Sequence, residues 1–171
     1  SGKTTGIFFK LIHMAKLQAP HKDGIRRTRA VIVRNTFPQL RDTTIKSWFE
    51  WFKDGPSGKW RATDKDFLLR YNDVECEVMF RALDTPDDIE RVLSLQVTFV
   101  LIDEFVYIPL DIMNALSSRC GRYPPPKDGG ATNWGIWGSS NPATEDNAWY
   151  DYLFTNLPTN ARYFKQPSGL S

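Results

Sequence analysis

Two short segments of the chain carry the residue types that bind a nucleoside triphosphate and Mg²⁺. Ser1-Gly2-Lys3-Thr4-Thr5 opens the chain, and Leu101-Ile102-Asp103-Glu104 ends an apolar run, with Asp103 lying 100 residues after Lys3. A lysine suits the β and γ oxygens of a triphosphate, backbone N–H groups at a helix start suit its phosphates, and a threonine hydroxyl suits the metal ion. We therefore predict that Ser1, Gly2, Lys3, Thr4 and Thr5 bind the phosphates.

The acidic pair belongs to the end of a short apolar run, residues 97–102, of the kind that is buried in a parallel sheet. Two adjacent acids at such a place are costly unless a cation or a reaction uses them. In enzymes with a phosphate loop, the first acid helps to hold Mg²⁺ and the second orients or deprotonates the attacking water. The alternative is a lysine at a helix start and a buried strand whose acidic end is merely solvated.

Length and composition indicate one α/β domain. The chain has 171 residues, of which 41% are hydrophobic and 25% charged, and these are ordinary values for a globular protein. No apolar run is long enough for a membrane helix, and we expect a soluble, intracellular protein. Cys76 and Cys120 lack C-x-x-C spacing, so neither a disulfide framework nor a zinc site is indicated.

Charge is distributed unevenly along the chain although the net charge is only +2. Residues 1–63 hold 13 basic and 4 acidic side chains, whereas residues 64–104 hold 4 basic and 11 acidic ones. The basic stretch at residues 21–29 is consistent with nucleic-acid contact. A solvated loop is the alternative interpretation of this stretch.

Hydrophobic periodicity and turn residues predict alternating helices and strands. After the phosphate loop we expect a helix over residues 4–18, a strand over 30–33, a helix from Pro38, a hairpin over 67–80, a short helix over 86–93, a helix over 109–118, a loop over 123–130, a strand over 133–138, a helix over 145–154 and a last strand over 162–164. The hairpin is an antiparallel insertion, because strands alternating with helices otherwise give a parallel sheet covered on both faces.

The predicted sheet brings the ends of two separate strands beside the phosphates, because ligands bind at the carboxyl ends of parallel strands. These ends are Asp103-Glu104 and Gly138-Ser139-Ser140-Asn141-Pro142. Short polar side chains at the second end can hydrogen-bond the attacking water or the γ-phosphate and move when that phosphate leaves. The alternative is that residues 139–142 form only a helix cap and a turn.

Several stretches together resemble a known family. They are Ser1-Gly2-Lys3-Thr4-Thr5-Gly6, Val33-Arg34-Asn35-Thr36-Phe37-Pro38-Gln39-Leu40-Arg41-Asp42, Phe99-Val100-Leu101-Ile102-Asp103-Glu104-Phe105, Gly138-Ser139-Ser140-Asn141-Pro142 and Tyr163-Phe164-Lys165-Gln166-Pro167-Ser168-Gly169. In order and spacing the chain resembles the ATPase domain of the large terminase subunit of tailed bacteriophages. The resemblance implies a P-loop NTPase fold of the RecA/ASCE type, with ATP and Mg²⁺ as cofactors.

The resemblance also implies a role for each matching residue. Lys3 and Thr4 look like the Walker A lysine and metal-binding threonine, Asp103 like the metal-binding Walker B aspartate, and Glu104 like the catalytic glutamate. Ser139, Ser140 and Asn141 look like the coupling motif. For the arginine that stabilises the transferring phosphoryl group, Arg91 is the best positional match, with Arg34 and Arg41 as rivals. An ion pair of Arg91 with Asp87 or Asp88 is the alternative.

A terminase-like chain is expected to couple ATP hydrolysis to translocation of double-stranded DNA into the procapsid. Its implied partners are DNA, the portal protein, the small terminase subunit and further copies in a ring, in the host cytoplasm and at the portal vertex. The first glycine of the phosphate loop would precede Ser1 and a nuclease domain would follow residue 171, so residues 1–171 are expected to be a single truncated ATPase domain. The alternatives are a non-catalytic nucleotide- or DNA-binding module and another ATPase of this class, such as a helicase or a small-molecule kinase.

Overall fold

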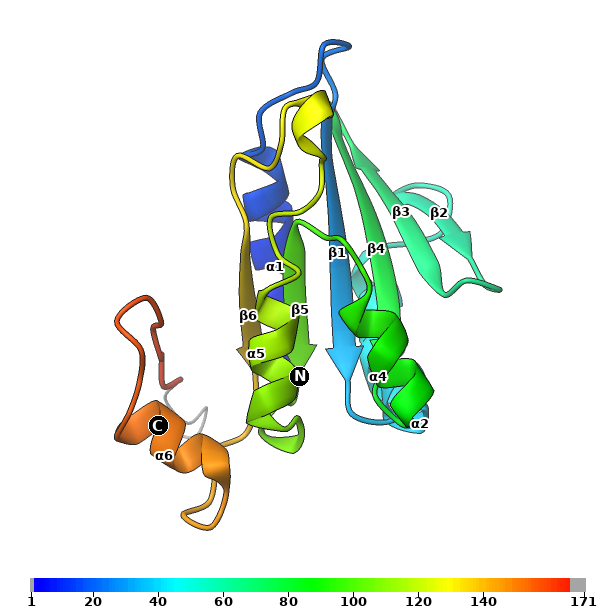
Figure 1. The fold of residues 1–171 in the computed structure, drawn as a ribbon. Coiled ribbons are helices and arrows are strands. Elements are labelled where there is room, and N and C mark those ends of the chain that lie inside the picture. The colour runs from blue at the N-terminus through cyan, green and yellow to red at the C-terminus, as the bar shows by residue number, and fades with distance from the viewer. Residues whose placement is uncertain (1, 167–171) are drawn as a thin grey trace.

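A six-stranded sheet forms the centre of the computed structural model, which describes residues 2–166 (Figure 1). In chain order the strands are β1 (Arg26–Arg34), β2 (Gly58–Arg61), β3 (Asp66–Tyr71), β4 (Val74–Ala82), β5 (Phe99–Asp103) and β6 (Gly135–Ser139). Their order in the sheet is β2-β3-β4-β1-β5-β6. The four strands β4, β1, β5 and β6 are parallel, and β2 and β3 add two antiparallel pairs. The predicted mostly parallel sheet with a hairpin insertion is therefore confirmed.

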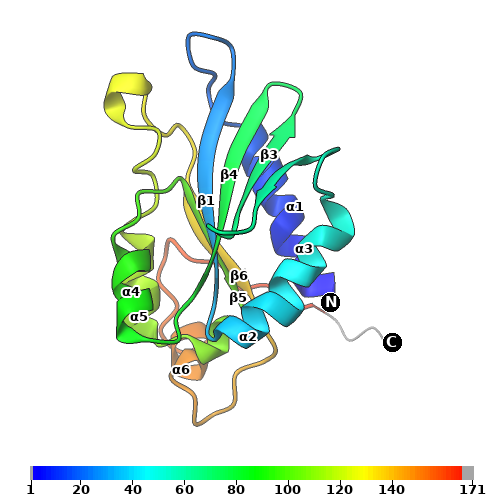
Figure 2. The same ribbon diagram turned by 90° about the vertical axis from the view of Figure 1, so that its right-hand side faces the viewer.

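Helices cover both faces of this sheet. The α-helices are α1 (Gly2–Lys16), α2 (Phe37–Gln39), α3 (Lys46–Trp51), α4 (Pro86–Leu93), α5 (Leu110–Ser117) and α6 (Ala148–Phe154); the other helical turns are the π-helix η1 (Leu40–Ile45) and the 3₁₀ turns η2 (Phe105–Tyr107) and η3 (Pro126–Asp128). Figure 2 shows α1 and α3 on one side of the strands and α4 and α5 on the other. Across residues 2–166, no helix is long and apolar enough to cross a membrane.

Strand alternation divides the apolar side chains between two cores. Ala30 and Ile32 of β1 lie in the core beneath α1, η1 and α3, together with Phe8 and Trp48. Their neighbours Val31 and Val33 lie in the second core, which contains the buried side chains of α4 and α5. Successive side chains of a strand point to opposite faces, so one buried strand supplies both cores.

β5 follows the same alternation. Phe99 and Leu101 belong to the core beneath α1, whereas Val100 and Ile102 belong to the core beneath α4 and α5. All four side chains are almost completely buried. The continuous apolar run that predicted a strand is thus explained by burial on both faces.

The uneven charge of the sequence is largely compensated where β1 and β4 lie side by side. Three arginines of β1 form ion pairs with acidic residues in or just before β4, namely Arg26–Asp73 (2.9 Å), Arg27–Glu75 (3.7 Å) and Arg29–Glu77 (3.0 Å). Arg27 also pairs with Asp23. These arginines are partners of the chain's own carboxylates, so the basic stretch at residues 21–29 is not a block of uncompensated positive charge.

The structure differs locally from the sequence-based expectations, and the bounds of two elements shift: β1 begins four residues before the predicted start at 30, and α6 begins three residues after the predicted start at 145. Residues 162–164 do not form the predicted strand: the Phe164 side chain is exposed and the Tyr163 ring instead packs on Phe154. The predicted loop over 123–130 contains the short turn η3. β2 was not predicted, because it is short and its first residue, Gly58, is also the last residue of a Gly-Pro-Ser-Gly turn. The helix that begins near Pro38 widens into the π-helix η1 before it continues as α3.

Candidate functional site

The start of α1 meets the carboxyl ends of β5 and β6 at one end of the sheet, where the arrowheads of these strands point (Figure 1). The Lys3 ammonium donates to Asn141 Oδ1 over 2.9 Å, and the Thr4 hydroxyl donates to Asp103 Oδ1 over 3.0 Å. Residues that are far apart in the sequence thus come within hydrogen-bonding distance. Ser1, which was also predicted to bind phosphate, lies outside the described residues.

Asp103 is the most deeply buried acid of this cluster, with 1% of its surface exposed. Its Oδ1 accepts from Thr4, while its Oδ2 accepts from Arg34 Nη1 over 3.0 Å and from the Thr44 hydroxyl over 2.7 Å. Asp103 lies two residues after Leu101 in β5, so both side chains point to the same face of the sheet. This is the face that α1 and η1 cover. The carboxylate therefore sits among donors from α1, β1 and η1.

Glu104 turns away from the strand that precedes it. Its backbone is left-handed, with φ 57° and ψ 60°, a conformation that is uncommon for residues other than glycine and that tends to occur at functional sites. Its Oε2 accepts from the Ser140 hydroxyl over 3.3 Å and from the Asn141 backbone N–H over 3.4 Å. The two adjacent acids thus have different partners: Asp103 contacts α1, β1 and η1, and Glu104 contacts the end of β6.

The end of β6 lies close against β5. Ser139 is the register partner of Asp103, and Gly138 is that of Ile102. A Cβ atom added to Gly138 would lie 2.7 Å from the Ile102 carbonyl oxygen and 3.2 Å from the Phe105 ring. Only a glycine fits here without displacement, and this close approach fixes the position of residues 139–141 relative to the two acids.

The other residues predicted to bind phosphate lie in the first turn of α1. Gly2 is exposed. Thr5 is half-buried, and its hydroxyl accepts a hydrogen bond from Trp51 Nε1 over 3.2 Å. The Trp51 side chain also packs its ring edge-to-face on Phe9, with centroids 5.2 Å apart. The start of α1 is therefore in contact with α3 as well as with β5.

Arg91 is not part of this cluster. It lies exposed in the last turn of α4, a helix that begins with a capping box between Thr85 and Asp88. In the part of the chain that the structure describes, no ion pair joins Arg91 to Asp87 or Asp88. Its assignment as the phosphoryl-stabilising arginine stays a prediction. Of the two rivals, Arg41 is exposed and pairs with Asp42, while Arg34 contacts Asp103.

The residues present suit a hard cation that is shared with phosphates. Thr4 Oγ1 and Asp103 Oδ1 are 3.0 Å apart, and two neighbouring ligands on an octahedral Mg²⁺ at about 2.0–2.1 Å are about 3 Å apart. Over residues 2–166 there is no group of three or more His, Cys, Asp or Glu side chains that could hold a metal ion. One hydroxyl and one carboxylate fit Mg²⁺, which is usually bound by one or two carboxylates together with substrate phosphates.

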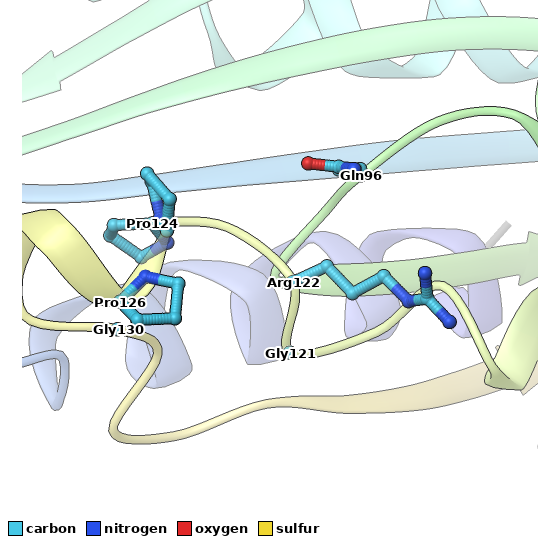
Figure 3. A pocket seen from close by; sticks show the side chains of 7 residues that line it. Gln96, Gly121, Arg122, Pro124, Pro126 and Gly130 are labelled. Atoms are coloured by element: carbon cyan, nitrogen blue, oxygen red, sulfur yellow. The ribbon is translucent and has the colours of Figure 1, made fainter.

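A separate cavity of about 370 Å³ lies at the other end of β5, near the residues that precede this strand. Figure 3 shows residues that line it, with the Arg122 side chain pointing away from Pro124 and Pro126. Its lining residues include no carboxylate, and none of them belongs to the cluster around Asp103. The cluster is therefore the better candidate for chemistry.

Two contacts of Asp103 could be anticipated only in part from the sequence. Arg34 was a candidate for the phosphoryl-stabilising arginine. It shares every second position of β1 with Ala30 and Ile32, and this spacing places it on the same face of the sheet as those residues. Thr44 was missed. Its only signal is a position four residues after the buried Leu40, on the inward face of a helical segment, where a hydroxyl needs a hydrogen-bond partner.

The fold is an α/β domain built on a mostly parallel six-stranded sheet. Among solved structures, the chain is similar to the large terminase of a thermophilic bacteriophage in crystal form 2, with a TM-score of 0.57 and 15% identity over 78% of this chain and 32% of that chain. Crystal form 3 of the same terminase gives a TM-score of 0.51 at 14% identity, covering 78% and 31% of the two chains. The complex of that terminase with ADP gives 0.50 at 15% identity, covering 79% and 29%.

The similarity confirms the predicted terminase-like fold. No protein-family model matches the chain, and no curated protein matches it either. The chain spans about a third of the length of the solved terminases that it resembles. At 15% identity the likeness concerns the fold alone, because one fold can carry many different functions.

Proposed function

We propose that this chain is the ATP-hydrolysing motor domain of a viral large terminase, which couples hydrolysis to the translocation of double-stranded DNA into a procapsid. One observation carries the proposal: at the carboxyl ends of parallel strands, in a terminase-like fold, Thr4 hydrogen-bonds to Asp103, and Asn141 hydrogen-bonds to both Lys3 and Glu104. Nucleotides bind at this end of such sheets.

Each side chain has a chemical role in this proposal. Lys3 neutralises the β and γ oxygens of ATP, as the Walker A lysine does in related enzymes. Thr4 and Asp103, the Walker B aspartate, would hold Mg²⁺, which would supply positive charge to neutralise the phosphates. Glu104 orients the attacking water and accepts its proton, a task that general bases perform with rate contributions of about 10²–10⁴.

Asn141 provides a physical basis for coupling. Its side-chain oxygen accepts from Lys3, and its backbone N–H donates to Glu104. An arriving γ-phosphate competes with Asn141 for the lysine, so nucleotide binding changes the contacts of the Ser139-Ser140-Asn141 segment. We propose that this segment carries the state of the nucleotide site to the elements that follow β6.

The partners belong to the same proposal. They are DNA, the portal protein, the small terminase subunit and further copies of the chain in a ring, in the host cytoplasm and at the portal vertex. The arginines of β1 are paired with carboxylates, so they are poor candidates for the DNA contact. Titration with duplex DNA at two salt concentrations tests this part, because affinity from phosphate contacts falls steeply with salt.

The replacement Glu104→Gln tests the ATPase activity in the protein at its full natural length. The variant keeps the size and most of the hydrogen bonding of the side chain but cannot accept a proton. We expect it to bind ATP as the natural protein does and to lose about 10²–10⁴-fold in turnover. Glu50→Gln, at an exposed position of α3, is the matched control and should turn over ATP normally.

Two outcomes would contradict the proposal in different ways. Turnover in Glu104→Gln that equals the natural rate would exclude the role given to Glu104. A natural protein that binds ATP without hydrolysing it would instead support the alternative of a non-catalytic nucleotide-binding module.

A further inference from the structure

The second oxygen of Asp103 is held by residues outside the two segments that first indicated a nucleotide site. Oδ1 faces the Thr4 hydroxyl, while Oδ2 accepts both from Arg34 Nη1 over 3.0 Å and from the Thr44 hydroxyl over 2.7 Å. The two oxygens are therefore not equivalent. Oδ1 faces Thr4, the second expected metal ligand, whereas Oδ2 is anchored to β1 and η1.

The three side chains that make these contacts are buried. Asp103 is 1% exposed, Arg34 is 9% exposed and Thr44 is completely buried. Arg34 Nε is also buried and has no hydrogen-bond partner among the described residues. Burying an ion pair often costs as much desolvation energy as its attraction returns, and a buried donor without a partner adds a further desolvation cost. The arrangement is therefore poorly explained by fold stability alone.

The elements that carry the two donors direct them at the same oxygen. Arg34 is the last residue of β1 and has the parity of Ala30 and Ile32, so it points to the face covered by α1, as Asp103 does from the neighbouring β5. Thr44 lies in the π-helix η1, is completely buried, and donates its hydroxyl to Asp103 at the end of β5. Such widened turns frequently occur at functional sites.

We propose that Arg34 and Thr44 are positioning residues for Asp103: they fix Oδ2, so that Oδ1 stays directed at Thr4, and thereby set the affinity of the site for its divalent cation. This inference rests on the proposed function. The partners that orient a metal ligand typically change metal affinity by about 10–100-fold when they are removed. The same contacts make Arg34 an internal group rather than one presented to a neighbouring subunit.

Thr44→Val and Thr44→Ser test this role at nearly constant shape. Valine keeps the volume and loses the hydroxyl, whereas serine keeps the hydroxyl. The first measurement is binding of Mn²⁺, followed by electron paramagnetic resonance, to the full-length protein with saturating ATPγS. The second is the Mg²⁺ concentration at which the binding of ATPγS is half-maximal.

We expect Thr44→Val to raise both cation concentrations about 10–100-fold, while Thr44→Ser stays within a few-fold of the natural protein. Arg34→Lys, which retains the charge but not the geometry of the guanidinium, should raise them as well. It also serves as the second variant if Thr44→Val does not fold.

Two results separate this inference from the proposed function. If Thr44→Val and Arg34→Lys melt at lower temperature but need no more Mn²⁺ or Mg²⁺ than the natural protein, the two residues are purely structural and the inference is wrong. If the natural protein itself shows no cation-dependent binding of ATPγS, the proposed function fails and the inference fails with it.

Discussion

Gly138→Ala tests the close approach of β6 to β5, on which the geometry of the site depends. The added methyl group would lie 2.7 Å from the Ile102 carbonyl oxygen and 3.2 Å from the Phe105 ring. Both distances are shorter than ordinary contacts of a methyl group, and the nearer atom belongs to the backbone of a buried strand. β6 must therefore move away from β5, and the Phe105 ring must shift as well.

The size of the effect follows from overpacking. Adding a methyl group to a well-packed place usually costs about 1–3 kcal/mol. For a chain of this length, 1 kcal/mol lowers the melting temperature by about 2–4 °C, so Gly138→Ala should melt about 2–12 °C lower. The shift also moves Ser139, Ser140 and Asn141, which follow directly, so ATP turnover should fall together with stability.

Gly135→Ala in the same strand is the matched control. A Cβ atom at Gly135 meets nothing within 4 Å, and an alanine that fits stabilises a chain by about 0.4–1 kcal/mol because it restricts the unfolded state. Thermal and urea unfolding of the two variants measure the difference directly. If both variants have the same free energy of unfolding, Gly138 is not packed closely against Ile102, and the prediction is wrong.

Two further predictions concern single side chains. Burial raises the pKa of the Cys76 thiol to about 12 and that of Cys120 to about 11. A thiol-reactive reagent that attacks the thiolate should therefore label both cysteines at pH 8 far more slowly in the folded protein than in urea. Equal labelling rates would contradict their burial. If Arg91 acts on a neighbour's nucleotide, mixing Arg91→Ala with Glu104→Gln subunits should restore part of the ATP turnover, and the absence of restoration at every mixing ratio would exclude that role.

The sequence predicted the elements whose residues interact locally or follow a clear period. The helix after Lys3 was predicted within two residues of the observed end at Lys16, because Ile7, Phe8 and Leu11 recur at helical spacing. The strand that ends at Asp103 was predicted because a run buried on both faces is continuously apolar. The hairpin was evident from alternating residues on both sides of Asn72-Asp73.

What the sequence could not predict depends on contacts between distant elements. The aromatic pair Tyr163-Phe164 favoured a strand, but a strand also needs a partner, and Tyr163 instead packs on Phe154. The pairing of basic β1 with acidic β4 was not predicted, since strand order is not visible in composition. The contact of Thr44 with Asp103 joins residues 59 positions apart, through a π-helix that no local signal marks.

The alternation of side chains along β5 has a consequence for how this chain can vary. Phe99, Leu101 and Asp103 share one face, and Val100 and Ile102 share the other. Deleting one residue within the strand would exchange the two apolar sets and also turn the carboxylate from the α1 side toward α4 and α5. Loops can gain or lose residues, but between Phe99 and Asp103 the chain can change length only in steps of two if both cores and the acid are to keep their sides.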